Sequence, residues 1–201
     1  MKTVFFDVDT QIDFLYPAGA LYVPGAERIV PVIATLNRHA AANGILVVST
    51  TDAHSENDPE FRDWPPHCVA GTFGQQKPQA TLLDRRVVIP STAGSFPLGD
   101  AQQVLLEKQT LDCFSNQNLP ALLDADRYVV YGVVTEICVR FAAFGLLKTG
   151  KPVSIVTDAV MHLDSAKRDS MLTDFVEHGG QLVHVAQALL PAASRLVSTL
   201  P

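Results

Sequence analysis

The sequence has 201 residues, of which 47% are hydrophobic and 18% are charged, so one domain spanning residues 1–201 can bury a substantial core. The formal net charge of −6 argues against nucleic acid and anionic membranes as partners, because both bind basic surfaces. Because no apolar run approaches membrane-spanning length and three scattered cysteines make no disulfide framework, we expect a cytoplasmic protein.

Segments typical of strands and of helices alternate along the chain. Short apolar, β-branched runs predict six strands, at Thr3–Val8, Ile45–Ser49, Gln103–Leu106, Tyr128–Val134, Val153–Val156 and Leu182–Val185. A shorter run at Arg86–Ile89 is a further candidate. Helical spacing predicts helices over Ala26–Ala42, near Leu119–Leu123, from Ile137 to Gly150, over Ser165–His178 and within the tail, 188–201. These repeated units predict an α/β fold with a mostly parallel, six-stranded sheet and helices on both faces.

Cys138 lies where the strand Tyr128–Val134 gives way to a helix. Unpaired N–H groups at a helix start stabilise negative charge, which favours the thiolate and any oxyanion beside it. The alternative is a buried cysteine that acts as a small hydrophobe. Asp9, Asp52 and Lys108 also follow predicted strands, and the carboxyl ends of parallel strands meet at one edge of a sheet. With Asp9 as base and Lys108 as the cation that holds the thiolate, the pattern predicts a nucleophilic cysteine.

A long irregular segment, 54–78, contains histidines, carboxylates and aromatic residues. Loops of this length in compact domains are usually functional or disordered. Two imidazoles and two carboxylates in or beside it form a ligand set that suits one divalent ion such as Zn, Fe or Mn. These potential ligands are Asp52, His54, Glu60 and His67. The alternative is that a histidine beside prolines is a turn residue that binds nothing. Phe14 and Trp64 would supply flat apolar walls for a small aromatic ligand.

Several motifs between Val4 and Asp158 together resemble the isochorismatase-like cysteine hydrolases, and within them most closely the nicotinamidase/pyrazinamidase branch. The motifs, in the order of that family, are Asp9-x-Gln11-x-Asp13-Phe14, Asp52-x-His54, Trp64-Pro65-Pro66-His67-Cys68 with Gly71-Thr72, Lys108 with Phe114, and Gly132-x-x-Thr135-x-x-Cys138-Val139. The Trp-Pro-Pro-His-Cys block is the most specific of them, because it marks the metal-dependent amidase branch.

The resemblance implies a Rossmann-like three-layer sandwich and a catalytic triad of Asp9, Lys108 and Cys138. It implies a cis peptide bond at Val133–Val134, with the backbone amides of Val134 and Cys138 forming an oxyanion hole. It further implies that one divalent ion, bound by the four potential ligands named above, holds the pyridine nitrogen of nicotinamide. Residues expected to contact this small-molecule amide are Phe14, Trp64, Val133 and Ile137. We also expect a homo-oligomer.

Two positions depart from the family pattern. Position 60 is Glu where many members carry a third His, and Ile137 precedes the nucleophile where a His is frequent. The sequence therefore predicts a metal-dependent cysteine amidohydrolase that converts nicotinamide or pyrazinamide to the acid and ammonia through a thioester. An isochorismatase-like amidohydrolase with a different substrate is the nearest alternative.

Two other functions are compatible with parts of the sequence. The run Phe5-Phe6-Asp7-Val8-Asp9 resembles the start of a haloacid-dehalogenase-type phosphatase, in which Asp7 would be the nucleophile and Asp9 an acid/base. That pattern requires Thr or Val at position 11, which is Gln, and it leaves Cys138 without a role. A catalytically inactive binding protein with the hydrolase fold is the other alternative, and the intact triad argues against it.

Overall fold

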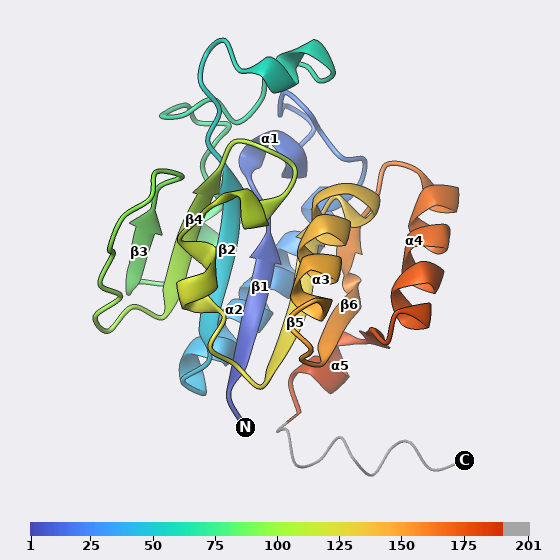
Figure 1. Cartoon of the computed structure of the whole chain (residues 1–201). Helices are drawn as coiled ribbons and strands as arrows, with labels where there is room; N and C mark the ends of the chain where they lie inside the picture. Colours follow the sequence, from blue (N-terminus) through green and yellow to red (C-terminus); the bar gives the residue numbers. More distant parts are fainter. Residues whose placement is uncertain (191–201) are drawn as a thin grey trace.

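Residues 1–190, which the computed structural model describes, contain one sheet of seven parallel strands in the order β3-β4-β2-β1-β5-β6-β7 (Figure 1). The strands are β1 (Thr3–Val8), β2 (Leu46–Asp52), β3 (Arg86–Ile89), β4 (Gln103–Lys108), β5 (Arg127–Val133), β6 (Val153–Met161) and β7 (Gln181–Val183). The six predicted strands are therefore confirmed, and the short run that was a further candidate adds the edge strand β3. Most of the helix expected within 188–201 falls outside the described residues.

Helices cover both faces of this sheet, as predicted (Figure 1). On one face α2 (Val30–Ala42) and α5 (Val185–Ala188) pack on a cluster of buried apolar residues that includes Phe5 and Tyr131. On the other face α3 (Arg140–Leu147) and α4 (Ser165–Glu177) pack on a second cluster. None of the helices in residues 1–190 is both long and apolar enough to cross a membrane.

Several short helical turns complete the fold. They are α1 (Ile12–Leu15) and the 3-10 turns η1 (Ala26–Ile29), η2 (Pro59–Arg62), η3 (Gln79–Thr81), η4 (Cys113–Ser115) and η5 (Leu119–Leu122). The helix predicted over Ala26–Ala42 thus begins with a 3-10 turn, and the one near Leu119–Leu123 is a single 3-10 turn. Pro31 lies in the first turn of α2 and Pro120 in η5, and a proline lacks the N–H group that a helix interior needs.

The strands that carry the predicted site residues lie side by side at the centre of the sheet. β1 pairs with β2 on one side and with β5 on the other. The chain therefore adds β2 to β4 to one side of β1 and β5 to β7 to the other side, and the order of strands reverses between β1 and β5. In parallel sheets the ligand site lies beyond the carboxyl ends of the strands at such a reversal. Asp9 follows β1 and Cys138 follows β5, so the topology places both at this edge.

Gly132, near the end of β5, allows a close approach of β1. Its φ is 122°, and a Cβ atom there would lie 2.1 Å from the carbonyl oxygen of Val8. The pairing of β5 with β6 also changes register between Val130 and Gly132. A glycine is required here because both the backbone conformation and the contact exclude a side chain.

We predict that Gly132→Ala lowers the free energy of unfolding by roughly 3–5 kcal/mol, through backbone strain and overpacking together. Gly150→Ala is the matched control, because Gly150 also has a positive φ, 74°, but a Cβ atom added there would meet nothing within 4 Å. That change should cost only about 1–2 kcal/mol. Urea unfolding of both variants measures the difference, and equal losses would contradict the role of the contact with Val8.

Candidate active site

Asp9 is held in a buried turn directly after β1. Its φ is 48°, a left-handed conformation that Asp tolerates better than most residues. Its N–H donates to the Thr50 carbonyl at 3.1 Å, and Thr50 Oγ1 donates to Asp9 Oδ1 at 2.6 Å. Burial raises the pKa of the Asp9 carboxyl, and the Lys108 ammonium lowers it only in part. Asp9 therefore binds a proton more readily than an ordinary aspartate.

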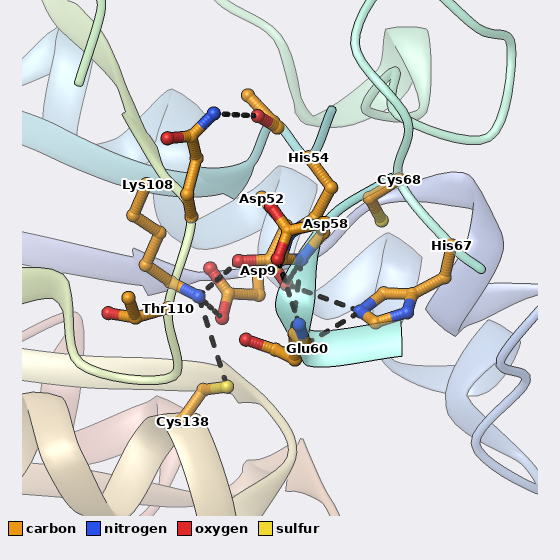
Figure 2. Close-up of polar contacts among 12 residues, drawn as sticks. Asp9, Asp52, His54, Asp58, Glu60, His67, Cys68, Lys108, Thr110 and Cys138 are labelled. Atoms are coloured by element: carbon orange, nitrogen blue, oxygen red, sulfur yellow. Dashed lines mark hydrogen bonds and ion pairs between the residues drawn. The ribbon is translucent and has the colours of Figure 1, made fainter. Parts of the chain in front are cut away.

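Lys108 joins the acidic residues to the cysteine. Its Nζ lies 2.9 Å from Asp9 Oδ2 and 4.0 Å from Cys138 Sγ, and it also contacts Asp52 Oδ1 (Figure 2). The side chain is 1% exposed. Burial alone would lower the pKa of Lys108, but the carboxylates of Asp52 and Asp9 outweigh it and raise this pKa well above its usual value. Lys108 is therefore a permanent cation at the centre of the site.

Cys138 lies in a π-helical turn, Thr135–Val139, that leads directly into α3. The helix thus starts two residues earlier than Ile137, where the sequence predicts it. Burial raises the pKa of the Cys138 thiol well above its ordinary value; Lys108 lowers it, and the nearby carboxylates of Asp9 and Asp52 raise it further. The effect expected of the helix start stays a prediction, and burial opposes it. Asp9 Oδ2 and Cys138 Sγ both lie beside the Lys108 ammonium, at 2.9 and 4.0 Å, so Asp9 is placed to take the proton of the thiol.

The potential metal ligands form a compact cluster beside the cysteine (Figure 2). Ligand atoms of Asp52, His54 and His67 all lie within 4.8 Å of one another. Oδ2 of Asp52 is 3.8 Å from His54 Nε2 and 3.9 Å from His67 Nε2. Oε1 of Glu60 is 3.9 Å from each of these two nitrogens. All four residues predicted from the sequence therefore point at one small region.

This cluster fits a divalent ion. Two ligands that are each about 2.0–2.2 Å from one ion can be at most about 4.4 Å apart, and the four separations given above fall below that limit. Nε2 of His54 is buried and has no hydrogen-bond partner among the described residues. Burial lowers the pKa of His67, which keeps that imidazole in the neutral form that binds metals.

The electrostatics of the cluster also favour a cation. Burial alone would lower the pKa of His54, but Asp52, Asp58 and Glu60 outweigh it and raise this pKa. Burial would raise the pKa of Asp52, but Lys108 and His54 lower it, so Asp52 is a carboxylate at neutral pH. Several carboxylates thus surround the imidazole of His54, and a cation bound between the potential ligands would compensate for their negative charge.

A small, largely apolar cavity lies between the cysteine and the potential metal ligands. Of the four residues predicted to contact substrate, Phe14, Trp64 and Ile137 line it. Val133 does not: it is fully buried in the core. Four further lining residues are not predicted from the sequence, and these are Leu21, Val23, Leu111 and Leu163. They come from three segments that are far apart in the sequence, so no local pattern indicates that they share a cavity.

The predicted oxyanion-hole residues also border this cavity. Val134 and Cys138 both line it, and the peptide bond Val133–Val134 is cis, which confirms that implication of the resemblance. Their role as an oxyanion hole stays a prediction.

Two polar residues of the first motif position the site without entering it. Gln11 binds β2, because Asp52 N–H donates to its Oε1 at 2.7 Å and its Nε2 donates to the Asp52 carbonyl at 2.8 Å. Asp13 Oδ2 accepts from the Cys68 N–H at 2.7 Å and so fixes the residue after His67. The motif identified both residues, but only the three-dimensional contacts assign them a role.

The phosphatase alternative requires Asp7 as a free nucleophile. Asp7 is fully buried, and its carboxylate accepts hydrogen bonds from Thr10 Oγ1 at 2.6 Å and Ser49 Oγ at 2.9 Å. Nδ2 of Asn37 donates at 3.2 Å, and Nζ of Lys77 lies 2.9 Å away. Asp7 is therefore part of a structural network and is not available to attack a substrate.

Comparison with known proteins agrees with this geometry. The family model described as "Isochorismatase domain" matches residues 3–187. The chain belongs to the isochorismatase family. The fold and the resemblance predicted from the sequence are therefore confirmed.

Named relatives share about a quarter of the sequence. The chain is 26% identical over 187 residues to the nicotinamidase of Escherichia coli (strain K12). This alignment covers 81% of this chain and 84% of the nicotinamidase. It is similar to the pyrazinamidase of Pyrococcus horikoshii solved in complex with zinc, with 28% identity and a TM-score of 0.75. That match covers 92% of this chain and 99% of the pyrazinamidase chain. It is also similar to the N-carbamoylsarcosine amidase of Thermoplasma acidophilum, with 25% identity and a TM-score of 0.73. That match covers 92% of this chain and 97% of the amidase chain.

We predict that a mild alkylating agent modifies Cys138 before the other two cysteines. Cys138 borders the cavity, is 7% exposed and lies 4.0 Å from the Lys108 ammonium, whereas Cys68 and Cys113 are only 0% and 2% exposed. Peptide mapping after partial reaction with iodoacetamide measures the order. Cys138→Ser is the control and should lack the fast phase; a fast phase that persists in it would contradict the assignment.

Proposed function

We propose that this isochorismatase-family hydrolase is a metal-dependent cysteine amidohydrolase that converts nicotinamide, or pyrazinamide, to the acid and ammonia. The observation that carries the proposal is the double role of Asp52. One of its oxygens contacts Lys108, which lies next to Cys138, and the other faces His54 and His67. A nucleophile and a metal cluster joined by one carboxylate suit a substrate that presents an amide and a metal-binding atom together.

The potential ligands Asp52, His54, Glu60 and His67 would hold the ion. A divalent ion such as Zn, Fe or Mn would supply a Lewis acid able to bind the pyridine nitrogen of the substrate. The zinc in the pyrazinamidase of Pyrococcus horikoshii supports this assignment. Phe14 and Trp64 would contact the flat ring, because both line the cavity between the ligands and the cysteine.

The first half of the proposed reaction forms a thioester. Asp9 takes the proton of Cys138, and the sulfur attacks the amide carbon, while Lys108 stabilises the thiolate. The backbone N–H groups of Val134 and Cys138 stabilise the resulting oxyanion, and loss of one such donor typically costs about 2.7–4 kcal/mol. Asp9 then returns the proton to the nitrogen, the carbon–nitrogen bond breaks, and ammonia leaves.

The second half regenerates the enzyme. Asp9 removes a proton from a water molecule, and the resulting hydroxide attacks the thioester carbon. The carbon–sulfur bond breaks, the acid leaves, and the proton held by Asp9 returns to the sulfur of Cys138. The raised pKa of Asp9 suits this role, because a base that binds its proton more firmly removes one more readily.

We predict that Asp9→Asn lowers kcat for nicotinamide hydrolysis by about 10²- to 10⁴-fold, the usual contribution of a general acid–base group. The change keeps the size of the side chain and an oxygen that can accept from Thr50, so the fold should be retained. Asp63→Asn, at an exposed aspartate of the metal-ligand loop, is the control and should keep the wild-type rate. Near-normal turnover in a folded Asp9→Asn variant would contradict the role of Asp9 as base.

A different amide is the main alternative, because the fold also occurs in an N-carbamoylsarcosine amidase. The four-ligand cluster beside the nucleophile favours an amide that carries a ring nitrogen. Ammonia release from nicotinamide, pyrazinamide, benzamide and N-carbamoylsarcosine, measured under one set of conditions, distinguishes these substrates. Faster turnover of N-carbamoylsarcosine than of either pyridine-type amide would overturn the substrate assignment and leave the cysteine mechanism in place.

We predict that removal of the ion by a chelator abolishes nicotinamide hydrolysis and that added Zn, Fe or Mn restores it. His54→Ala should raise KM for nicotinamide by roughly 10-fold or more, since even outer-shell partners of a metal contribute 10–100-fold. Benzamide lacks the ring nitrogen, so it should be a poor substrate of the wild type and insensitive to His54→Ala. Equal hydrolysis of both amides by metal-free protein would contradict the proposed role of the ion.

Three further inferences accompany this proposal. We infer that residues 1–201 form one domain, that the chain is a homo-oligomer, and that it acts in the cytoplasm. The cysteines Cys68, Cys113 and Cys138 are free and buried, which suits a reducing compartment. The oligomeric state remains a prediction, to be measured by light scattering.

A further inference from the structure

The loop that carries the potential metal ligands contains a third carboxylate that points inward. Asp58 is 8% exposed and lies between His54 and Glu60 in the sequence. It does not belong to the compact group of ligand atoms that Asp52, His54 and His67 form. It nevertheless contacts two of the four potential ligands, one through each of its oxygens.

The first oxygen faces the imidazole of His54. Oδ2 of Asp58 lies 3.1 Å from His54 Nδ1, on the side of the ring away from Nε2 (Figure 2). Nε2 is the nitrogen that faces Asp52 and Glu60. A carboxylate beside Nδ1 favours the tautomer with its proton on Nδ1, which leaves the lone pair of Nε2 free to bind a metal.

The second oxygen holds the element that carries Glu60. Oδ1 of Asp58 accepts a hydrogen bond from the Glu60 N–H at 3.0 Å and so caps the 3-10 turn η2. Glu60 is the second residue of this turn, and its side chain faces His54 and His67. The orientation of Glu60 therefore depends on the same carboxylate that contacts His54.

We propose that Asp58 is a positioning residue for the metal site, which orients His54 through one oxygen and Glu60 through the other. The inference rests on the proposed metal site but adds a residue that neither the sequence motifs nor the ligand cluster contain. Asp58 does not touch the ion in this proposal. Its effect is on the affinity for metal, because a ligand held in one tautomer and one orientation loses less freedom when it binds.

The test uses a substitution that keeps the cap and removes the contact with His54. Ser caps helical turns about as well as Asp, but its single short hydroxyl cannot also reach the imidazole. Asp58→Ser should therefore retain η2 and lose the contact with Nδ1, whereas Asp58→Ala should lose both. Asp63→Ser is the matched control, because Asp63 follows the same turn and its side chain is exposed.

The measurement is the Kd of the full chain for Zn²⁺, obtained by competition with a chromophoric chelator and requiring no substrate. Asp58→Ser should weaken Zn²⁺ binding about 10- to 100-fold, the usual effect of losing an outer-shell partner, and Asp58→Ala at least as much. Asp63→Ser should bind within about twofold of the wild type, and the urea midpoint of metal-free Asp58→Ser should match that of the metal-free wild type, which shows that the fold is intact.

The outcomes separate this inference from the proposals on which it rests. Wild-type affinity in Asp58→Ser would overturn the role of Asp58 and leave the metal site in place, because the cap alone would then suffice. A wild type that binds no Zn²⁺, or a His54→Ala variant that binds it normally, would overturn the metal site and the role of Asp58 together. Failure of nicotinamide hydrolysis, by contrast, would leave the Zn²⁺ result unchanged.

Discussion

One buried ammonium group holds the active site together. Removing the carboxylates of Asp9 and Asp52 from water is costly unless a nearby cation compensates for both charges. Without such a cation, repulsion between the two carboxylates would make one of them take up a proton. Lys108, which is 1% exposed and contacts both, is that cation. The proposed base, Asp9, and one potential metal ligand, Asp52, therefore depend on a single side chain at the end of β4. The sulfur of Cys138, the proposed nucleophile, lies 4.0 Å from the same ammonium.

The same arrangement explains how a buried thiol can act as a nucleophile. Burial raises the pKa of Cys138 and also that of Asp9, so neither group is charged as readily as it would be in water. Transfer of the proton from sulfur to the carboxylate moves one negative charge between two atoms that are both close to Lys108. The net charge of the three groups does not change, so the step avoids most of the cost of creating a new ion in a dry interior. In the proposed mechanism the thiol is therefore activated by proton transfer within a group of compensated charges, and not by a lowered thiol pKa.

The strands that support the site extend further than the sequence predicts. The prediction ends the second strand at Ser49 and the next central one at Leu106, because polar residues normally leave a buried strand there. In the structure β2 continues to Asp52 and β4 to Lys108, and these two residues are partners in the β2–β4 register. Their opposite charges compensate each other inside the sheet. Local pattern reading fails at these positions because the compensation comes from a residue 56 positions away in the sequence.

The sequence by itself determines the alternation of strands and helices, the α/β class and the identity of the residues that carry chemistry, because hydrophobic period and residue type are local properties. It also indicates that Asp9, Lys108 and Cys138 meet, since the ends of parallel strands share one edge. Only the tertiary structure decides the burial of the thiol, the exclusion of Val133 from the cavity, and the contacts that Gln11, Asp13 and Asp58 make with the segments that carry the potential ligands. Those properties depend on burial and on contacts between distant segments, which the order of residues does not contain.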